Sequence, residues 1–152
     1  MGNELIVRKE IQLNADISRV WEILTKPEWT RQYMFGCEVE SDWIVGSPIV
    51  WKFFLNGTKM VFVKGSIVSI EVGRLLQYTT FDPNSTLEDV PANYTTVTYS
   101  LIPEHGHIIL SVSQGDFIKI ADGPKRYAET LAGWESVLSS IKDIVEAKTA
   151  VL

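Results

Sequence analysis

Cysteine is almost missing from this sequence of 152 residues. Its one cysteine, Cys37, has no partner for an internal disulfide, a pattern typical of a reducing compartment. No apolar run approaches the ~20 residues that a membrane span requires. Charged residues between Glu4 and Glu10 also interrupt any signal-peptide core. We therefore expect a cytoplasmic protein with no membrane span.

The sequence also lacks any concentration of positive charge. Its 14 Lys and Arg are scattered and are outnumbered by 19 Asp and Glu, which gives a net charge of −5. Nucleic-acid binding depends on basic clusters that neutralise phosphates. We therefore expect no nucleic acid among the partners.

Motifs for catalysis and for cofactors are missing as well. The sequence contains no Gly-rich phosphate loop, no GxSxG elbow and no HExxH. His105 and His107 fall in an expected hairpin turn without further metal ligands beside them, and Cys37 has no neighbouring base to activate its thiol. Glu38 and Glu40 share one face of an expected strand, which is typical of an acid–base pair but equally of an exposed face. We expect no metal, no cofactor and no catalytic residue; enzyme activity stays open, with a binding protein favoured.

What is present is the composition of an ordinary globular domain. Apolar residues make up 45% of the chain and charged residues 22%, close to average usage. A chain of this length typically buries about 68–70% of its unfolded surface, so it folds without a disulfide or a metal. We expect a single domain over residues 1–152.

Strand patterns fill most of the chain before residue 115. A first strand is expected over residues 4–13, followed by a helix over 16–24 and, after Pro27, a short helix over 28–34. Six further strands are expected over residues 37–44, 49–55, 59–70, 74–81, 94–102 and 107–114. Their connections are short, apart from a polar loop over 82–92, and Asn56-Gly57 is a strong two-residue hairpin turn. Short connections predict an antiparallel sheet.

One long helix is expected at the end of the chain, over residues 123–147. Its apolar residues recur every three or four positions and form one continuous stripe of Tyr127, Leu131, Trp134, Leu138, Ile141 and Val145. The fold class is therefore α+β, with a sheet of about six to seven strands and a long C-terminal helix.

Four segments resemble a known family. Residues 20–28 are similar to the first helix of the START-like, helix-grip superfamily; residues 65–70 and 74–79 resemble its central hairpin, and residues 133–138 its terminal helix. That superfamily includes polyketide cyclases, lipid-transfer domains and relatives of the birch-pollen allergen. Within it, the chain resembles most the group named for the activator of the ninety-kilodalton heat-shock chaperone ATPase, over about residues 4–147.

The resemblance implies a curved antiparallel sheet wrapped around the long helix, with two short helices after the first strand. It also implies a cavity between sheet and helix that holds a lipid, sterol, polyketide or flavonoid. The same fold serves enzymes, carriers and partner-binding modules, so the resemblance alone leaves the function open.

The candidate ligand-binding residues are mostly aromatic. Trp51, Phe53 and Leu55 alternate onto one face of their strand, and Trp134 lies near the middle of the helix stripe. Thr80 and Thr98 are possible polar anchors, as are the tyrosines among the candidates. The full set is Trp51, Phe53, Met60, Phe62, Tyr78, Tyr99, Tyr127, Leu131 and Trp134, with Met34 and Phe35 at an expected cavity mouth. An ordinary hydrophobic core would explain many of the same residues.

We expect the protein to bind an apolar small molecule as a carrier or sensor. One alternative is an enzyme of the cyclase or hydratase type, in which an acid, a tyrosine or Arg31 polarises the substrate. Another is a module that contacts a chaperone through an exposed apolar patch. The chaperone activator carries an additional N-terminal domain, whereas the first strand here begins at about residue 4, so we expect a small-molecule ligand rather than a chaperone.

Overall fold

The computed structural model describes residues 4–147. Its elements are β1 (Val7–Leu13), α1 (Ile17–Thr25), α2 (Pro27–Tyr33), β2 (Glu38–Ser41), β3 (Pro48–Leu55), β4 (Thr58–Glu71), β5 (Leu75–Thr80), the single 3-10 turn η1 (Pro91–Asn93), β6 (Thr95–Glu104), β7 (His107–Gly115) and α3 (Gly123–Glu146). This order confirms the α+β class and the sequence of elements expected above. No helix within residues 4–147 is long and apolar enough to cross a membrane.

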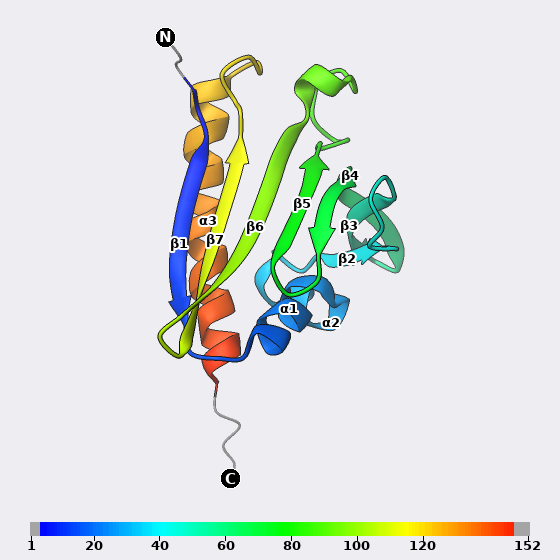
Figure 1. The fold of residues 1–152 in the computed structure, drawn as a ribbon. Coiled ribbons are helices and arrows are strands. Elements are labelled where there is room, and N and C mark those ends of the chain that lie inside the picture. Colours follow the sequence, from blue (N-terminus) through cyan, green and yellow to red (C-terminus); the bar gives the residue numbers. More distant parts are fainter. Residues whose placement is uncertain (1–3, 148–152) are drawn as a thin grey trace.

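The strands form one antiparallel sheet in the order β1-β7-β6-β5-β4-β3-β2. Hairpins connect consecutive strands from β2 to β7, and β1 pairs with β7 at the far edge. Figure 1 shows α3 lying along β1 and β7, with α1 and α2 near the C-terminal end of α3. This is the helix-grip architecture.

Alternation along the strands decides what faces α3. In β7, Ile108, Leu110 and Val112 are buried, while the residues between them are partly exposed. Burial on α3 is concentrated from its middle to its C-terminal end, at Trp134, Val137, Leu138, Ile141 and Val145. The earlier stripe residues Tyr127 and Leu131 are only half-buried. The core therefore lies under the C-terminal half of α3.

Two expected details of β2 and β3 are corrected. Strand β2 ends at Ser41 rather than near Ile44, because the Ser41 hydroxyl accepts a hydrogen bond from the Trp43 backbone N–H at 3.0 Å and Trp43 adopts φ 58°. The expected alternation of Trp51, Phe53 and Leu55 fails after Trp51. The register of the β3–β4 pair shifts between Trp51 and Lys52, where Phe62 of β4 has no partner, and Leu55 at the end of β3 is exposed.

The turns follow their sequence signals closely. Asn56 and Gly57 both have positive φ, 53° and 81°, as a two-residue hairpin turn requires. Gly65 serves a different purpose, because a Cβ added there would lie 1.7 Å from the Thr79 carbonyl oxygen. Only glycine permits this close approach of β4 to the end of β5.

Candidate functional site

A cavity of about 420 Å³ lies between the inner face of the sheet and the N-terminal half of α3. Residues from β3 to β7, α3 and the segment after α2 contribute to its wall. They are Met34, Phe35, Trp51, Phe62, Val63, Tyr78, Thr80, Asp82, Val97, Gln114, Glu129, Thr130, Gly133, Trp134 and Val137. We call this space the aromatic compartment.

A row of four aromatic rings runs from β3 to α3 on the inner side of the sheet. The ring centroids of Trp51 and Tyr78 are 6.2 Å apart, and those of Tyr78 and Tyr99 are 6.4 Å apart. Tyr99 meets Trp134 edge-on, at 5.6 Å and an interplanar angle of 87°. Aromatic pairs favour such tilted and edge-on geometries, so Trp51, Tyr78 and Trp134 form a preformed wall that Tyr99 supports from behind.

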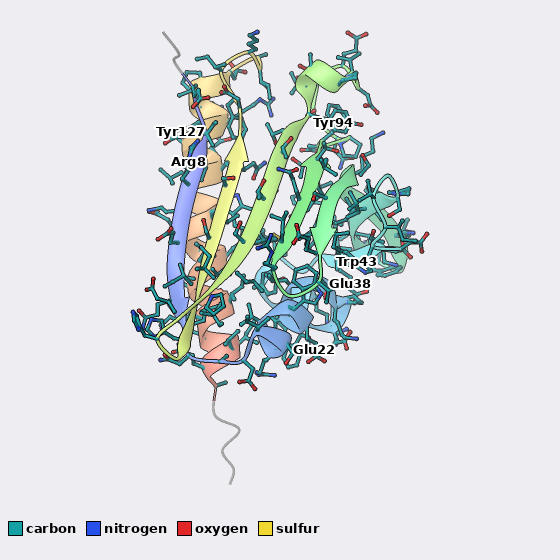
Figure 2. All side chains as sticks on the ribbon, viewed as in Figure 1. Arg8, Glu22, Glu38, Trp43, Tyr94 and Tyr127 are labelled. Carbon is teal, nitrogen blue, oxygen red and sulfur yellow. The ribbon has the colours of Figure 1, made fainter. Side chains whose placement is uncertain are left out.

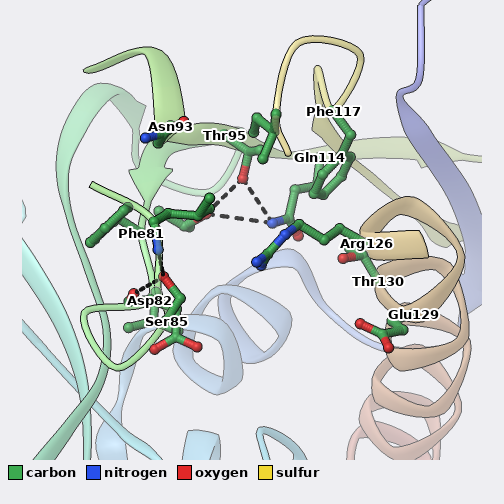
Figure 3. Close-up of a pocket in the computed structure, with 14 residues that line it drawn as sticks. Phe81, Asp82, Ser85, Asn93, Thr95, Gln114, Phe117, Arg126, Glu129 and Thr130 are labelled. Carbon is green, nitrogen blue, oxygen red and sulfur yellow. Dashed lines mark hydrogen bonds between the residues drawn. The ribbon is translucent and has the colours of Figure 1, made fainter. Parts of the chain in front are cut away.

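A smaller compartment of about 190 Å³ continues from the first one (Figure 3). The two are contiguous, because Val63, Thr80, Asp82, Gln114, Glu129 and Thr130 line both of them. The smaller one adds Phe81, Ser85, Leu87, Asn93, Thr95, Phe117, Ile120 and Arg126. A larger share of its wall is polar than in the aromatic compartment, and we call it the polar compartment.

A hydrogen-bond network joins the two compartments. The Trp134 indole Nε1–H donates to Gln114 Oε1 at 2.8 Å, and Gln114 Nε2 donates to Thr95 Oγ1 at 3.0 Å and to Thr80 Oγ1 at 3.4 Å. The hydroxyls of Thr80 and Thr95 are 2.8 Å apart. Gln114 uses both ends of its amide, so it holds the Trp134 ring in place from the opposite wall.

Buried tyrosines back the aromatic compartment. The Tyr33 hydroxyl donates to the Ile23 carbonyl oxygen at 2.8 Å, whereas the buried Tyr99 hydroxyl has no hydrogen-bond partner within residues 4–147. Burial raises the pKa of Tyr78, and burial together with the neighbouring Tyr78 and Tyr33 raises the pKa of Tyr99. At neutral pH both hydroxyls therefore stay protonated; they can donate hydrogen bonds but cannot act as bases.

The structure brings six of the eleven candidate ligand-binding residues to the cavity wall: Met34, Phe35, Trp51, Phe62, Tyr78 and Trp134. Tyr99 lies behind that wall and touches it through the rings of Tyr78 and Trp134. Phe53 packs edge-on against Phe62, with ring centroids 6.0 Å apart. Neither Phe53 nor Met60, Tyr127 or Leu131 lines either compartment.

Sequence reasoning missed most of the polar wall. Of the two threonines considered as anchors, Thr80 lines the cavity, but Thr98 accepts a hydrogen bond from Gln77 on the other face of the sheet. Gln114 and Thr95 were not singled out, although each sits where the buried alternation of its strand predicts an apolar residue. A polar residue at a core-facing strand position was the available signal.

The other chemical candidates lie outside the cavity. The Arg31 guanidinium pairs with the Glu38 carboxylate at 3.2 Å, and Glu38 lies across the molecule from Tyr127 on α3 (Figure 2). A hydrogen bond from Lys52 is the main reason why the pKa of Glu40 lies below its usual value, so this carboxylate is charged and paired rather than poised as an acid. Burial raises the pKa of the Cys37 thiol, which makes it less reactive.

No group of three or more His, Cys, Asp or Glu side chains within residues 4–147 is placed to hold a metal ion. His105 is exposed in the β6–β7 turn, with φ 49°, and His107 is half-buried at the start of β7. Neither histidine is among the residues of the cavity wall.

A seven-stranded antiparallel sheet that grips a C-terminal helix, with a cavity between them, defines a helix-grip protein of the START-like superfamily. The chain belongs to the family described as Activator of Hsp90 ATPase homolog 1-like protein, whose sequence model matches residues 14–146. Comparison with curated proteins gives no match.

Several solved structures are similar to this chain. ChR145 from Cytophaga hutchinsonii is 32% identical, with a TM-score of 0.80 over 99% of this chain and 100% of that one. The Aha1 dimer from Colwellia psychrerythraea is 16% identical, with a TM-score of 0.71 over 95% and 98% of the two chains. DynU16, from the dynemicin biosynthetic locus, is 16% identical, with a TM-score of 0.73 over 96% of this chain and 49% of that one. The last two share the fold alone.

Proposed function

We propose that the protein binds an apolar small molecule in the aromatic compartment and acts as its carrier or sensor. The observation that carries the proposal is the cavity of about 420 Å³ between sheet and helix. Native cores leave few voids larger than a water molecule, whereas ligand pockets span about 300–1,000 Å³ and are mostly apolar with a few polar anchors. A space of this size, lined by Trp51, Tyr78 and Trp134, matches the second description.

The preformed wall supports binding over catalysis. A cyclase or hydratase needs an ionisable group inside the cavity that exchanges protons near neutral pH. The tyrosine of the aromatic compartment, Tyr78, has its pKa raised by burial, and Arg31 lies elsewhere, paired with Glu38. Of the two carboxylates on the wall, Asp82 accepts a hydrogen bond from the Asn84 backbone N–H and Glu129 is exposed. The fold itself occurs in DynU16, a protein of a biosynthetic locus, which agrees with a small organic molecule as the ligand.

A second candidate is a protein-contacting module. Large apolar side chains are exposed beside the cavity and on the β3–β4 hairpin, at 65% for Phe35, 57% for Phe54 and 55% for Leu55. Exposed apolar groups of this kind favour a partner surface, and the family description refers to a chaperone activator. Binding of a purified chaperone of that class, lost on changing Phe54 and Leu55 to Ser, would favour this candidate over the cavity.

Gly133 offers a direct test of the cavity, because it lines the aromatic compartment and a Cβ added there meets no atom within 4 Å. Gly133→Leu should place a side chain in the cavity and abolish binding while the protein stays folded. Gly133→Ala is the matched control. It should stabilise α3 by about 0.5–1 kcal/mol through helix propensity and leave binding intact.

The probes are palmitate, cholesterol, naringenin and an anthraquinone, each followed by thermal unfolding and by quenching of tryptophan fluorescence. At 100 times its dissociation constant a ligand stabilises the folded state by about 2.7 kcal/mol. At least one probe should raise the melting temperature of the parent and of Gly133→Ala but not of Gly133→Leu. Equal shifts in all three proteins would place binding outside the cavity. No shift by any probe, with native mass spectrometry showing only bare chain, would refute the proposal.

A further inference from the structure

We infer that the ligand is a monocarboxylic acid, whose carboxylate binds Arg126 in the polar compartment while its apolar body fills the aromatic compartment. This inference rests on the proposed function, since it names the chemical class of the molecule in the same cavity. It starts from a cationic side chain that the fold directs into a cavity and leaves without an anion.

Arg126 lies in the first turn of α3 and extends into the polar compartment, near Gln114 (Figure 3). Its Nε–H donates to the Ala121 carbonyl oxygen at 3.0 Å, which fixes the plane of the guanidinium. Within residues 4–147 the guanidinium has no carboxylate within 4 Å and no hydrogen bond to another side chain. Its terminal N–H groups are therefore free to bind a planar anion through two parallel hydrogen bonds.

The neighbouring carboxylates do not take that role. Asp82 lines the same compartment, but its Oδ1 accepts a hydrogen bond from the Asn84 backbone N–H at 2.8 Å. Glu129 is exposed on α3, three residues after Arg126, and forms no ion pair with it.

The same charges limit the anion to a single negative charge. Arg126 is the only Lys or Arg among the residues that line the two compartments, which also include Asp82 and Glu129. A dianion such as a phosphate monoester would meet two like charges and one opposite charge, so a monoanion is favoured. Thr80 and Thr95 line the same space, and one of their hydroxyls donates to the other at 2.8 Å. The remaining hydroxyl proton can donate to a carboxylate.

Because the two compartments are contiguous, they determine the shape of the ligand. Gln114 and Thr80 line both spaces, so one ligand can reach Arg126 with its head while its body lies against Trp51 and Trp134. A neutral sterol or alcohol would bury the guanidinium without an anion, which costs affinity. Arg126 therefore discriminates between an acid and its neutral analogue.

The test uses three probes with one chain length: dodecanoic acid, dodecan-1-ol and dodecyl phosphate. Isothermal titration at neutral pH should give the tightest binding for the acid. Arg126→Gln removes the charge at similar length. It should weaken binding of the acid by about tenfold or more, the value of a charge-assisted hydrogen bond, and should strengthen binding of the alcohol, which no longer buries an unpaired guanidinium. Lys125→Gln is the matched control, because Lys125 is exposed on the same turn and lines neither compartment; it should bind all three probes as the parent does.

The outcomes separate this inference from the proposed function. If acid and alcohol bind the parent equally, or if Arg126→Gln weakens both alike, the carboxylate assignment is overturned while the cavity stands. Tighter binding of the phosphate than of the acid also overturns it. If none of the three probes binds, and palmitate, cholesterol, naringenin and the anthraquinone do not bind either, both proposals are refuted.

Discussion

Hydrogen bonds and ring contacts hold single side chains of the cavity wall in fixed positions. Trp134 is edge-on to Tyr99 and donates its indole N–H to Gln114, whose amide nitrogen is itself held by Thr95 and Thr80. Each of these contacts reduces the rotamer freedom that a ligand would otherwise have to freeze on binding. The wall is thus preorganised at the residue scale.

Trp134 and Ile141 provide a matched pair for testing wall against core. Both are buried on the same stripe of α3, but only Trp134 lines the cavity. We expect Trp134→Ala and Ile141→Ala each to cost about 2–4 kcal/mol, because both remove a large buried side chain. Only Trp134→Ala should also lose ligand affinity, by at least tenfold for a truncated aromatic contact. Denaturant unfolding and titration of the best probe measure both effects, and loss of affinity in Ile141→Ala as well would remove the distinction between wall and core.

The helices divide the work between stability and access. The C-terminal half of α3 closes the core, whereas its N-terminal half covers the cavity. α1 and α2 have nine and seven residues, too short to be stable without tertiary packing. The segment that follows them holds Phe35 and Gly36 at positive φ, 54° and 83°, and Met34 and Phe35 line the cavity. This segment forms one rim of the cavity, and α1 and α2 precede it in the chain.

Amide hydrogen exchange should therefore differ along the chain. We expect faster exchange in α1, α2 and residues 34–37 than in the second half of α3, because short helices open locally at lower free-energy cost. A bound probe should slow exchange in the rim and leave the end of α3 unchanged. Equal protection of both regions, unaffected by ligand, would show that the rim does not gate the cavity. Gly133→Leu serves as the control, since the same probe should then have no effect.

At the scale of the whole molecule, three of the five tyrosines are buried in the core. Tyr33, Tyr78 and Tyr99 are buried on the inner side, and burial is the main cause that raises the pKa of each hydroxyl. The folded protein keeps these protons at a pH where the unfolded chain, with tyrosine pKa values near about 10, releases them. The shifts therefore destabilise the folded state as the pH rises.

The resulting prediction is a steep alkaline transition. The contribution of these groups to stability is fully present below pH ~10 and is lost above it, with a slope approaching ~4 kcal/mol per pH unit for three protons. Ultraviolet absorbance of tyrosinate should therefore rise together with loss of the circular dichroism signal. Tyr78→Phe should remove about a third of that slope, since one of the three groups is gone. Reversible ionisation of all tyrosines while the protein stays folded would contradict the burial argument.

The order and type of the elements were predictable from the sequence, since they depend on patterns within a dozen residues. The alternation along β6 and β7, the stripe of α3 and the Asn56-Gly57 turn each specify a local conformation. Boundaries proved less predictable. The ends of β2 and the bulge after Trp51 depend on Ser41 hydrogen bonds and on pairing with β4, which no local pattern contains.

By itself, then, the sequence determined an antiparallel sheet, three helices in their places and an aromatic inner surface. Tertiary structure alone decided which aromatics became wall and which became core. That choice depends on strand register and sheet curvature, because a shift of one residue turns a side chain to the other face. It also brought Thr80, Thr95 and Gln114 together from three strands and set Arg126 beside them. Residues so far apart in the chain meet only when the sheet closes around α3. The polar part of the site therefore depends on the tertiary structure.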